Sequence, residues 1–180
     1  MIKEFKLDLY RYFGDEKIPL KKKVFKSPVR KYQYYFRKYQ SSNSKIVKFY
    51  CSTKLNKLKN KTLIQIPKET KIGSGFYIGH LGRIIINPEA VLGKNVNIAT
   101  GVTIGQESRG KRIGSPTIGD SVWIGTNSVI VGNIKIGNDV LIAPLSFVNF
   151  DVPDHSIVIG NPAKIIHREN ATEGYLLNKV

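Results

Sequence analysis

Histidine is the side chain best suited to proton transfer near neutral pH, and this chain has three histidines. His80 lies in the segment Ile78-Gly79-His80-Leu81-Gly82-Arg83, where a six-residue repeat of apolar residues loses its register. His155 and His167 lie in the C-terminal region, and we interpret them as ordinary polar residues. A positioned histidine can act as a general base. His80 is therefore a candidate for this role, and an ordinary surface residue is the alternative.

A second group of candidate residues lies in an insertion at Gln106–Pro116. It carries Arg109, Lys111 and Arg112, whose positive charges suit the phosphates of a cosubstrate or an acceptor molecule. Loops that leave a rigid scaffold often carry binding residues. We expect these three residues to bind substrate beside His80, and a solvated basic loop is the alternative.

The repeat around these residues predicts the fold. Apolar residues recur every six positions from Ile66 to Ile78, from Ile86 to Ile104 and from Ile118 to Ile142. The register slips by two residues after Ile78, and eight extra residues follow Ile104. A period of six fits neither a helix nor a simple strand and is typical of a parallel β-helix. We expect extended structure from about Leu63 and about six coils of eighteen residues, each with three short strands.

Corner residues should follow the inward-pointing isoleucines. Gly119, Gly125 and Gly137 each follow an isoleucine, and we expect them at corners where a positive φ favours glycine. Asparagine also tolerates positive φ, so four asparagines are expected at corners: Asn95, Asn127, Asn133 and Asn138.

Positive charge is concentrated before the repeat. Residues 1–62 contain 18 Lys and Arg against 4 Asp and Glu, whereas residues 63–180 contain 11 against 9. Apolar residues at helical spacing predict helices at 2–13, at 29–39 and after a capping serine, Ser44. We therefore divide the chain into a basic, mostly helical N-terminal region (1–62), a β-helix domain (63–152) and a C-terminal tail (153–180). The first and last segments can cover the two open ends of the β-helix.

The basic region, which includes the lysine run Lys21-Lys22-Lys23, has three possible roles. It could be a solvated helical cap whose tyrosines pack on the repeat domain, or a surface that contacts an anionic membrane or a lipid-linked substrate. Nucleic-acid binding is the third, and no known binding motif accompanies the charge. Vesicle co-sedimentation at two salt concentrations tests the membrane interpretation.

Other features of the sequence favour a cytoplasmic protein, with possible association with the inner face of the membrane. There is no run of about 18 apolar residues, and charged residues interrupt the first apolar positions. The single cysteine, Cys51, excludes an internal disulfide and suits a reducing compartment.

Several segments resemble the hexapeptide-repeat acyltransferases. They are the hexads, Gly101-Val102-Thr103-Ile104-Gly105, Asp151-Val152-Pro153 and Gly160-Asn161-Pro162-Ala163-Lys164, and the resemblance covers about residues 63–167. The chain is most similar to the serine acetyltransferase branch, and closer still to the O-acetyltransferases found with capsule and exopolysaccharide genes. The resemblance implies a left-handed parallel β-helix, a homotrimer and acetyl-CoA in a groove between subunits.

The resemblance also assigns roles to individual residues. His80 falls at the catalytic position of the family. The segment that contains Gly125 and Thr126 is expected to contact the pantetheine arm through backbone amides, and Lys164 and Arg168 are expected near the CoA phosphates. The zinc-binding carbonic anhydrases that share this fold need a close pair of histidines within the coils. That pair is absent here, so we expect no metal site.

Two departures from the serine enzymes bear on the acceptor. Gly79 replaces the aspartate before the catalytic histidine, and Gly114-Ser115 replaces an arginine–histidine pair that meets the charged amino acid in those enzymes. We therefore expect acetyl transfer to a saccharide hydroxyl of a capsule or exopolysaccharide or of its precursor. No candidate serine or cysteine nucleophile lies beside His80, so we expect the transfer to be direct. The alternatives are serine O-acetyltransfer for cysteine biosynthesis and a non-catalytic trimeric β-helix scaffold.

Overall fold

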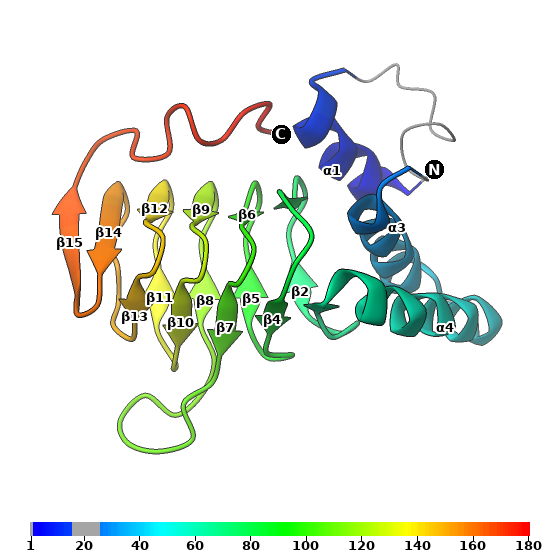
Figure 1. The fold of residues 1–180 in the computed structure, drawn as a ribbon, viewed down its shortest axis with the longest axis horizontal. Helices are drawn as coiled ribbons and strands as arrows, with labels where there is room; N and C mark the ends of the chain where they lie inside the picture. Colours follow the sequence, from blue (N-terminus) through cyan, green and yellow to red (C-terminus); the bar gives the residue numbers. More distant parts are fainter. Residues whose placement is uncertain (1, 16–25) are drawn as a thin grey trace.

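The computed structural model describes residues 2–15 and 26–180. Within these residues, three helices are followed by a parallel β-helix of about five turns, and the helices lie at one end of it (Figure 1). The helices are α1 (Lys3–Phe13), α3 (Pro28–Ser41) and α4 (Lys45–Thr62). The predicted helices are thus confirmed, and the Ser44 hydroxyl caps α4 by accepting from the Val47 amide. The lysine run 21–23 lies outside the described residues.

Three sheets form the faces of the β-helix. The first contains β1 (Ile64–Gln65), β4 (Ile84–Ile86), β7 (Thr103–Gly105), β10 (Val129–Val131) and β13 (Phe147–Val148). The second contains β2 (Lys71–Ile72), β5 (Val91–Leu92), β8 (Thr117–Ile118) and β11 (Lys135–Ile136). The third contains β3 (Tyr77–Ile78), β6 (Asn97–Ile98), β9 (Val122–Ile124), β12 (Val140–Ile142), β14 (Ser156–Gly160) and β15 (Ala163–His167).

Strand pairing reproduces the two irregularities of the repeat. Ile72 pairs with Leu92, Leu92 pairs with Ile118, and Ile118 pairs with Ile136, so the successive coils are 20, 26 and 18 residues long. The two extra residues of the first coil lie between β3 and β4, at the corner that carries His80. The insertion of the third coil lies between β7 and β8 as an exposed loop (Figure 1). Both predicted breaks are confirmed.

The number of coils is smaller than predicted. We expected about six, and the strand order gives about five. After Gly160 the chain reverses, and β15 pairs antiparallel with β14 instead of starting a further coil. The remaining residues then run back along the β-helix toward α1 (Figure 1).

Close packing between coils explains the repeat glycines. A Cβ on Gly119 would lie 2.7 Å from the carbonyl oxygen of Gly137 in the next coil. One on Gly125 would lie 2.6 Å from the backbone nitrogen of Pro144. None of Gly119, Gly125 and Gly137 has a positive φ, so our prediction about their backbone conformation is wrong. These positions need glycine because neighbouring backbones almost touch there.

The left-handed corners are formed by other residues. Asn95 and Asn127 have φ angles of 56° and 58°, as predicted, whereas Asn133 and Asn138 do not have positive φ. The Asn138 side chain instead bridges coils, because its Oδ1 accepts from the amide of Asp120 at 2.8 Å.

Side chains of α1 and α3 hydrogen bond to the free edge of the first coil. The Tyr32 hydroxyl donates to the Ile66 carbonyl at 3.0 Å and accepts from the Ile66 amide at 3.2 Å. The Tyr12 hydroxyl accepts from the Ile78 amide at 3.0 Å. An uncovered strand edge leaves backbone groups without partners, and these side chains take the place of a missing coil. The predicted covering of this end by the N-terminal region is confirmed.

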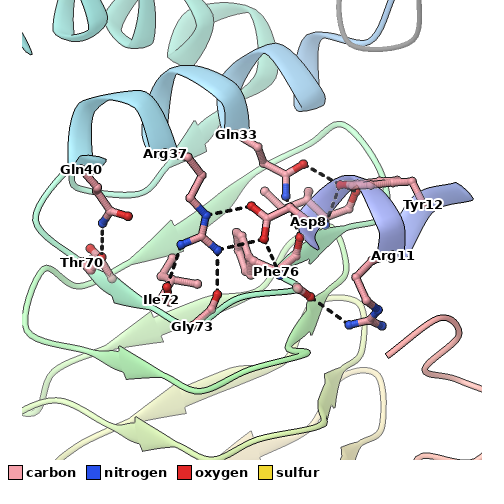
Figure 2. A network of polar contacts seen from close by, with 12 residues as sticks. Asp8, Arg11, Tyr12, Gln33, Arg37, Gln40, Thr70, Ile72, Gly73 and Phe76 are labelled. Atoms are coloured by element: carbon pink, nitrogen blue, oxygen red, sulfur yellow. Dashed lines mark hydrogen bonds and ion pairs between the residues drawn. The ribbon is translucent and has the colours of Figure 1, made fainter. Parts of the chain in front are cut away.

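A buried ion pair lies at the centre of this contact (Figure 2). Arg37 Nε and Nη2 lie 2.8 Å and 3.0 Å from the two carboxylate oxygens of Asp8, and both side chains are almost fully buried. Arg37 also donates to the carbonyls of Ile72 and Gly73 at 2.7 Å each. Asp8 accepts from the Phe76 amide at 2.9 Å. One pair therefore joins α1, α3 and the first coil.

The far tip of the helical region is exposed and partly apolar. Ile46 and Phe49, in the first turns of α4, are 82% and 76% exposed. No helix among the described residues is long and apolar enough to cross a membrane. Peripheral contact between residues 1–62 and an anionic membrane stays a prediction.

Removing one member of the buried ion pair should destabilise the fold strongly. Asp8→Ala leaves the Arg37 charge buried without its partner, and we expect a loss of about 3–5 kcal/mol in the free energy of unfolding. Urea denaturation measures it, with Glu69→Ala, an exposed carboxylate, as the matched control. The double variant Asp8→Ala/Arg37→Met should recover part of the loss, since no charge is then left alone. An Asp8→Ala variant as stable as the control would contradict this role.

Candidate active site

His80 is exposed at the corner between β3 and β4 and lines a cavity of about 390 Å³. Tyr12 of α1, Tyr77 of β3, Trp123 of β9 and Tyr175 of the tail line the same cavity. The two residues added to the first coil lie at this corner. The register slip therefore presents an imidazole to a partly aromatic hollow.

No hydrogen bond reaches the His80 ring from residues 2–15 or 26–180. A general base usually has a partner that fixes its tautomer and orientation. The residue before His80 is Gly79, which has no side chain that could bond to the imidazole ring. The partner is thus missing within the described part of one chain.

The other two histidines are exposed or half-buried and belong to a polar cluster on another edge. His155 Nδ1 lies 2.9 Å from Asp139 Oδ2 and 3.5 Å from Glu169 Oε2. His167 Nε2 lies 3.4 Å from Glu169 Oε1. Neither residue lines the His80 cavity, which agrees with their interpretation as ordinary polar residues.

We call the corners that follow β3, β6, β9 and β12 the His80 edge; they comprise residues 79–83, 99–102, 125–128 and 143–146. Gly125 and Thr126 lie on this edge, and Thr126 lines the His80 cavity. Lys164 pairs with Ile159 near the end of β14 that approaches the same edge. Arg168 donates its amide to the His155 carbonyl at 2.8 Å and so lies at the opposite end of the sheet. The structure thus brings together three of the four predicted acetyl-CoA contacts.

The backbone of the predicted pantetheine segment is mostly occupied within the β-helix. The amide of Gly125 donates to Ile142, that of Asn127 to Thr100, and that of Ser128 to Gly125. The Thr126 amide has no partner among the described residues. Our expectation of several free amides is therefore reduced to the amide of Thr126.

The basic loop leaves the β-helix at a different corner from His80. It begins where β7 ends, whereas His80 precedes the start of β4 in the same sheet. Glu107 and Gly114 exchange backbone hydrogen bonds of 3.0 Å at its base, and Arg112 Nε lies 3.8 Å from Glu107 Oε2. Arg109 and Lys111 are exposed. Within one chain the loop does not lie beside His80, contrary to our expectation.

Sequence reasoning missed two parts of the chain that contribute residues to the cavity. Arg11 comes from α1, and Tyr175, Leu177 and Asn178 come from the tail. The Tyr175 ring lies 4.9 Å from the Trp123 ring, centroid to centroid. No repeat or motif marks these residues, because they reach the cavity only through the folding back of both ends of the chain. Among the described residues no group of three or more His, Cys, Asp or Glu could hold a metal ion.

Comparison with known proteins identifies part of the repeat and several relatives. Residues 115–149 match the family model described as bacterial transferase hexapeptide (six repeats). The chain is 44% identical over 105 residues to serine acetyltransferase 4 of Arabidopsis thaliana. The aligned segment covers 57% of this chain and 29% of that protein. The chain is also 38% identical over 115 residues to serine acetyltransferase of Staphylococcus aureus (strain Mu50), and the aligned segment covers 63% of this chain and 53% of that protein.

A solved structure extends the match to the helical region. Serine acetyltransferase from Brucella abortus strain S19 superposes with a TM-score of 0.70 at 26% identity, over 94% of this chain and 70% of that one. The chain spans about a third to a half of the length of the curated relatives described above.

These comparisons correct the predicted acceptor. The relatives are named serine acetyltransferases rather than capsule or exopolysaccharide O-acetyltransferases, so the prediction of a saccharide acceptor and of a role in polysaccharide biosynthesis is wrong. The error came from Gly79 and Gly114-Ser115, whose lack of charge we took to exclude an amino acid. Charge lost at one position can be supplied from an element far away in sequence.

The polar cluster formed by His155, Asp139, Glu169 and His167 predicts that the stability of the fold depends on pH. Burial raises the pKa of Asp139, but hydrogen bonds from Thr172, His155 and the Ala171 amide outweigh it and hold that pKa below its usual range. The hydrogen bond to Asp139 raises the pKa of His155 above its ordinary value. A raised histidine pKa stabilises the fold fully below about pH 6.5, and this contribution is lost as pH rises through the raised value.

We therefore expect the thermal unfolding midpoint to fall by a small amount between about pH 6 and pH 8, because the His155 side chain is 43% exposed and solvent screens its interaction with Asp139. The variant His155→Gln should flatten that slope, whereas His167→Gln should change it less. An unchanged slope in His155→Gln would contradict the assignment.

Proposed function

We propose that this chain transfers the acetyl group of acetyl-CoA to the hydroxyl group of serine. The observation that carries the proposal is His80, exposed in an aromatic cavity at the point where the hexapeptide repeat breaks. The names of the similar proteins support serine as the acceptor. The product, O-acetylserine, would then serve cysteine biosynthesis.

His80 acts as the general base in this proposal. As the serine oxygen attacks the acetyl carbonyl, the imidazole takes the hydroxyl proton and a tetrahedral intermediate forms. Collapse of the intermediate breaks the carbon–sulfur bond, and the imidazolium returns the proton to the CoA sulfur. The residues that line the cavity include no cysteine or serine, which favours direct transfer over a covalent enzyme intermediate.

Acetyl-CoA is proposed to lie along the His80 edge. Thr126 offers its amide near His80, and Lys164 offers a positive charge further along the edge, near the end of β14. A cation suits the nucleotide phosphates, whereas a neutral amide suits the pantetheine arm. Arg168 lies at the other end of the sheet, so we assign it no contact with the acetyl-CoA of its own chain.

We also propose a homotrimer in which each site uses two subunits. Arg109, Lys111 and Arg112 lie on a loop at a corner away from the His80 edge, and no group in the described part of the chain orients His80. A neighbouring subunit can supply both. The resemblance to the family implies such a trimer, and closed cyclic assemblies are the common form of homo-oligomers.

Replacing the base should remove most of the activity. We expect His80→Ala to lower kcat/KM for serine by about 10²- to 10⁴-fold, because general base catalysis contributes on that order. Release of the CoA thiol from acetyl-CoA in the presence of serine measures the rate. His167→Ala, which changes an exposed histidine outside the cavity, is the matched control and should keep its activity.

Two results would overturn the proposal. Near-normal turnover by His80→Ala would contradict the role of His80 as the base. A wild-type protein that releases no thiol with serine would contradict serine as the acceptor. A chain that also fails to bind acetyl-CoA in calorimetry would instead support a non-catalytic scaffold.

A shared site predicts complementation between two inactive variants. His80→Ala retains the loop, and Arg109→Ser/Lys111→Ser/Arg112→Ser retains the base. Co-refolding equal amounts should restore roughly a quarter of wild-type activity, the share of contacts that join an intact loop to an intact base in a cyclic trimer. Size-exclusion chromatography with light scattering gives the assembly mass. An active monomer, or mixed subunits that stay inactive, would show that the site is built otherwise.

A further inference from the structure

Arg11 is a buried cation with no carboxylate partner in the part of the chain that the structure describes. It lies in the last turn of α1 and is 3% exposed. Its Nε donates to the Leu177 carbonyl at 2.8 Å, Nη1 to the Gly75 carbonyl at 2.9 Å, and Nη2 to Asn97 Oδ1 at 2.8 Å. All three acceptors are neutral. Among residues 2–15 and 26–180, no carboxylate forms an ion pair with Arg11.

The neighbouring buried arginine, Arg37, has a carboxylate partner. Arg37 is equally buried, and it pairs with the Asp8 carboxylate through two nitrogens (Figure 2). Buried charges are normally paired because removal from water costs several kcal/mol per ion. Burial accordingly lowers the pKa of Arg11 from its ordinary value. Among the described residues Arg11 thus has no ion-pair partner of the kind that Arg37 has.

The guanidinium of Arg11 also has unused donors. It carries five N–H groups, and the three bonds above use one on each nitrogen. One hydrogen remains on each of Nη1 and Nη2. An arginine can donate from both Nη1 and Nη2 to the two oxygens of one carboxylate.

Arg11 lines the same cavity as His80. At about 390 Å³ that cavity falls within the range of small-molecule sites and can hold an amino acid. The cavity therefore contains a candidate base for a hydroxyl group and a cation that lacks an anion. No acidic residue lines it.

We propose that Arg11 binds the carboxylate of the acceptor amino acid. The inference rests on the proposed serine acetyltransfer and names a residue that selects the acceptor. It also accounts for Gly114-Ser115, where the resembled enzymes carry an arginine–histidine pair: α1 supplies the positive charge that is missing at these two positions. Serine held by its carboxylate on Arg11 would then present its hydroxyl group toward His80.

The tail holds Arg11 in position. The Leu177 carbonyl accepts from Nε, and Asn178 Nδ2 donates to the Arg11 carbonyl at 3.4 Å. The Val180 amide and carbonyl bond to the Asn95 side chain at 2.9 Å and 2.7 Å. These bonds fix the guanidinium before substrate binds, which reduces the entropic cost of binding.

The test compares two acceptors that differ only at the carboxylate, L-serine and L-serinamide. We expect Arg11→Gln to lower kcat/KM for serine by about tenfold to a hundredfold, as for a lost charged hydrogen bond, mainly through KM. The value for serinamide and the KM for acetyl-CoA should change little. Arg11→Lys keeps the charge and loses the paired donors, so its kcat/KM for serine should lie between those of the wild type and Arg11→Gln. Lys71→Gln removes an exposed charge on β2 and serves as the matched control.

Each other outcome has a definite meaning. Equal losses with serine and serinamide would show that Arg11 only joins α1 to the first coil and the tail. A rise in the KM for acetyl-CoA alone would assign Arg11 to a CoA phosphate. Either result overturns the inference and leaves serine acetyltransfer intact. If Arg11→Gln does not fold, the ratio of the two acceptors in Arg11→Lys decides the question. A wild-type enzyme that acetylates neither acceptor rejects the proposed function itself.

Discussion

The stacking of one coil on the next governs this molecule. Isoleucines such as Ile118 and Ile136 pack in columns inside the β-helix, and backbone hydrogen bonds join their strands. At the corners the backbones come so close that Gly119 has no room for a side chain. Strand spacing of about 4.8 Å leaves no space for extra residues within a face. Extra residues therefore collect at corners, and the two places where they do are the His80 corner and the basic loop.

The same constraint requires caps at both ends. A β-helix ends in strand edges with unpaired backbone groups, and α1 and α3 bond to the first of them through Tyr12, Tyr32 and the Asp8–Arg37 pair. At the other end β15 covers β14 by antiparallel pairing. Capping brings α1 against the His80 cavity, and the return of the tail brings Tyr175 there. Structural covering and construction of the site are thus the same packing event.

Part of this architecture could be read from particular residues. The hexads predicted the β-helix, Ser44 predicted the start of α4, and the slip after Ile78 marked the corner of His80. The count of coils was wrong because the chain reverses after Gly160, and no periodic signal shows that reversal. The interpretation of Gly119 was wrong because backbone crowding between coils is not a property of the local sequence. The acceptor was wrong because Gly79 and Gly114-Ser115 were judged without the residues that surround them in space.

The sequence by itself determined the repeat, its two breaks and the histidine that lies at one of them. These features follow from spacing along the chain, because each coil repeats the same local pattern of inward isoleucines. Only the tertiary structure placed Arg11 and the tail in the His80 cavity, and only it placed the basic loop at another corner. Those relations join residues that lie tens to more than a hundred positions apart. Such long-range contacts form only when the folded chain brings distant polar groups together. Local sequence patterns therefore do not predict them.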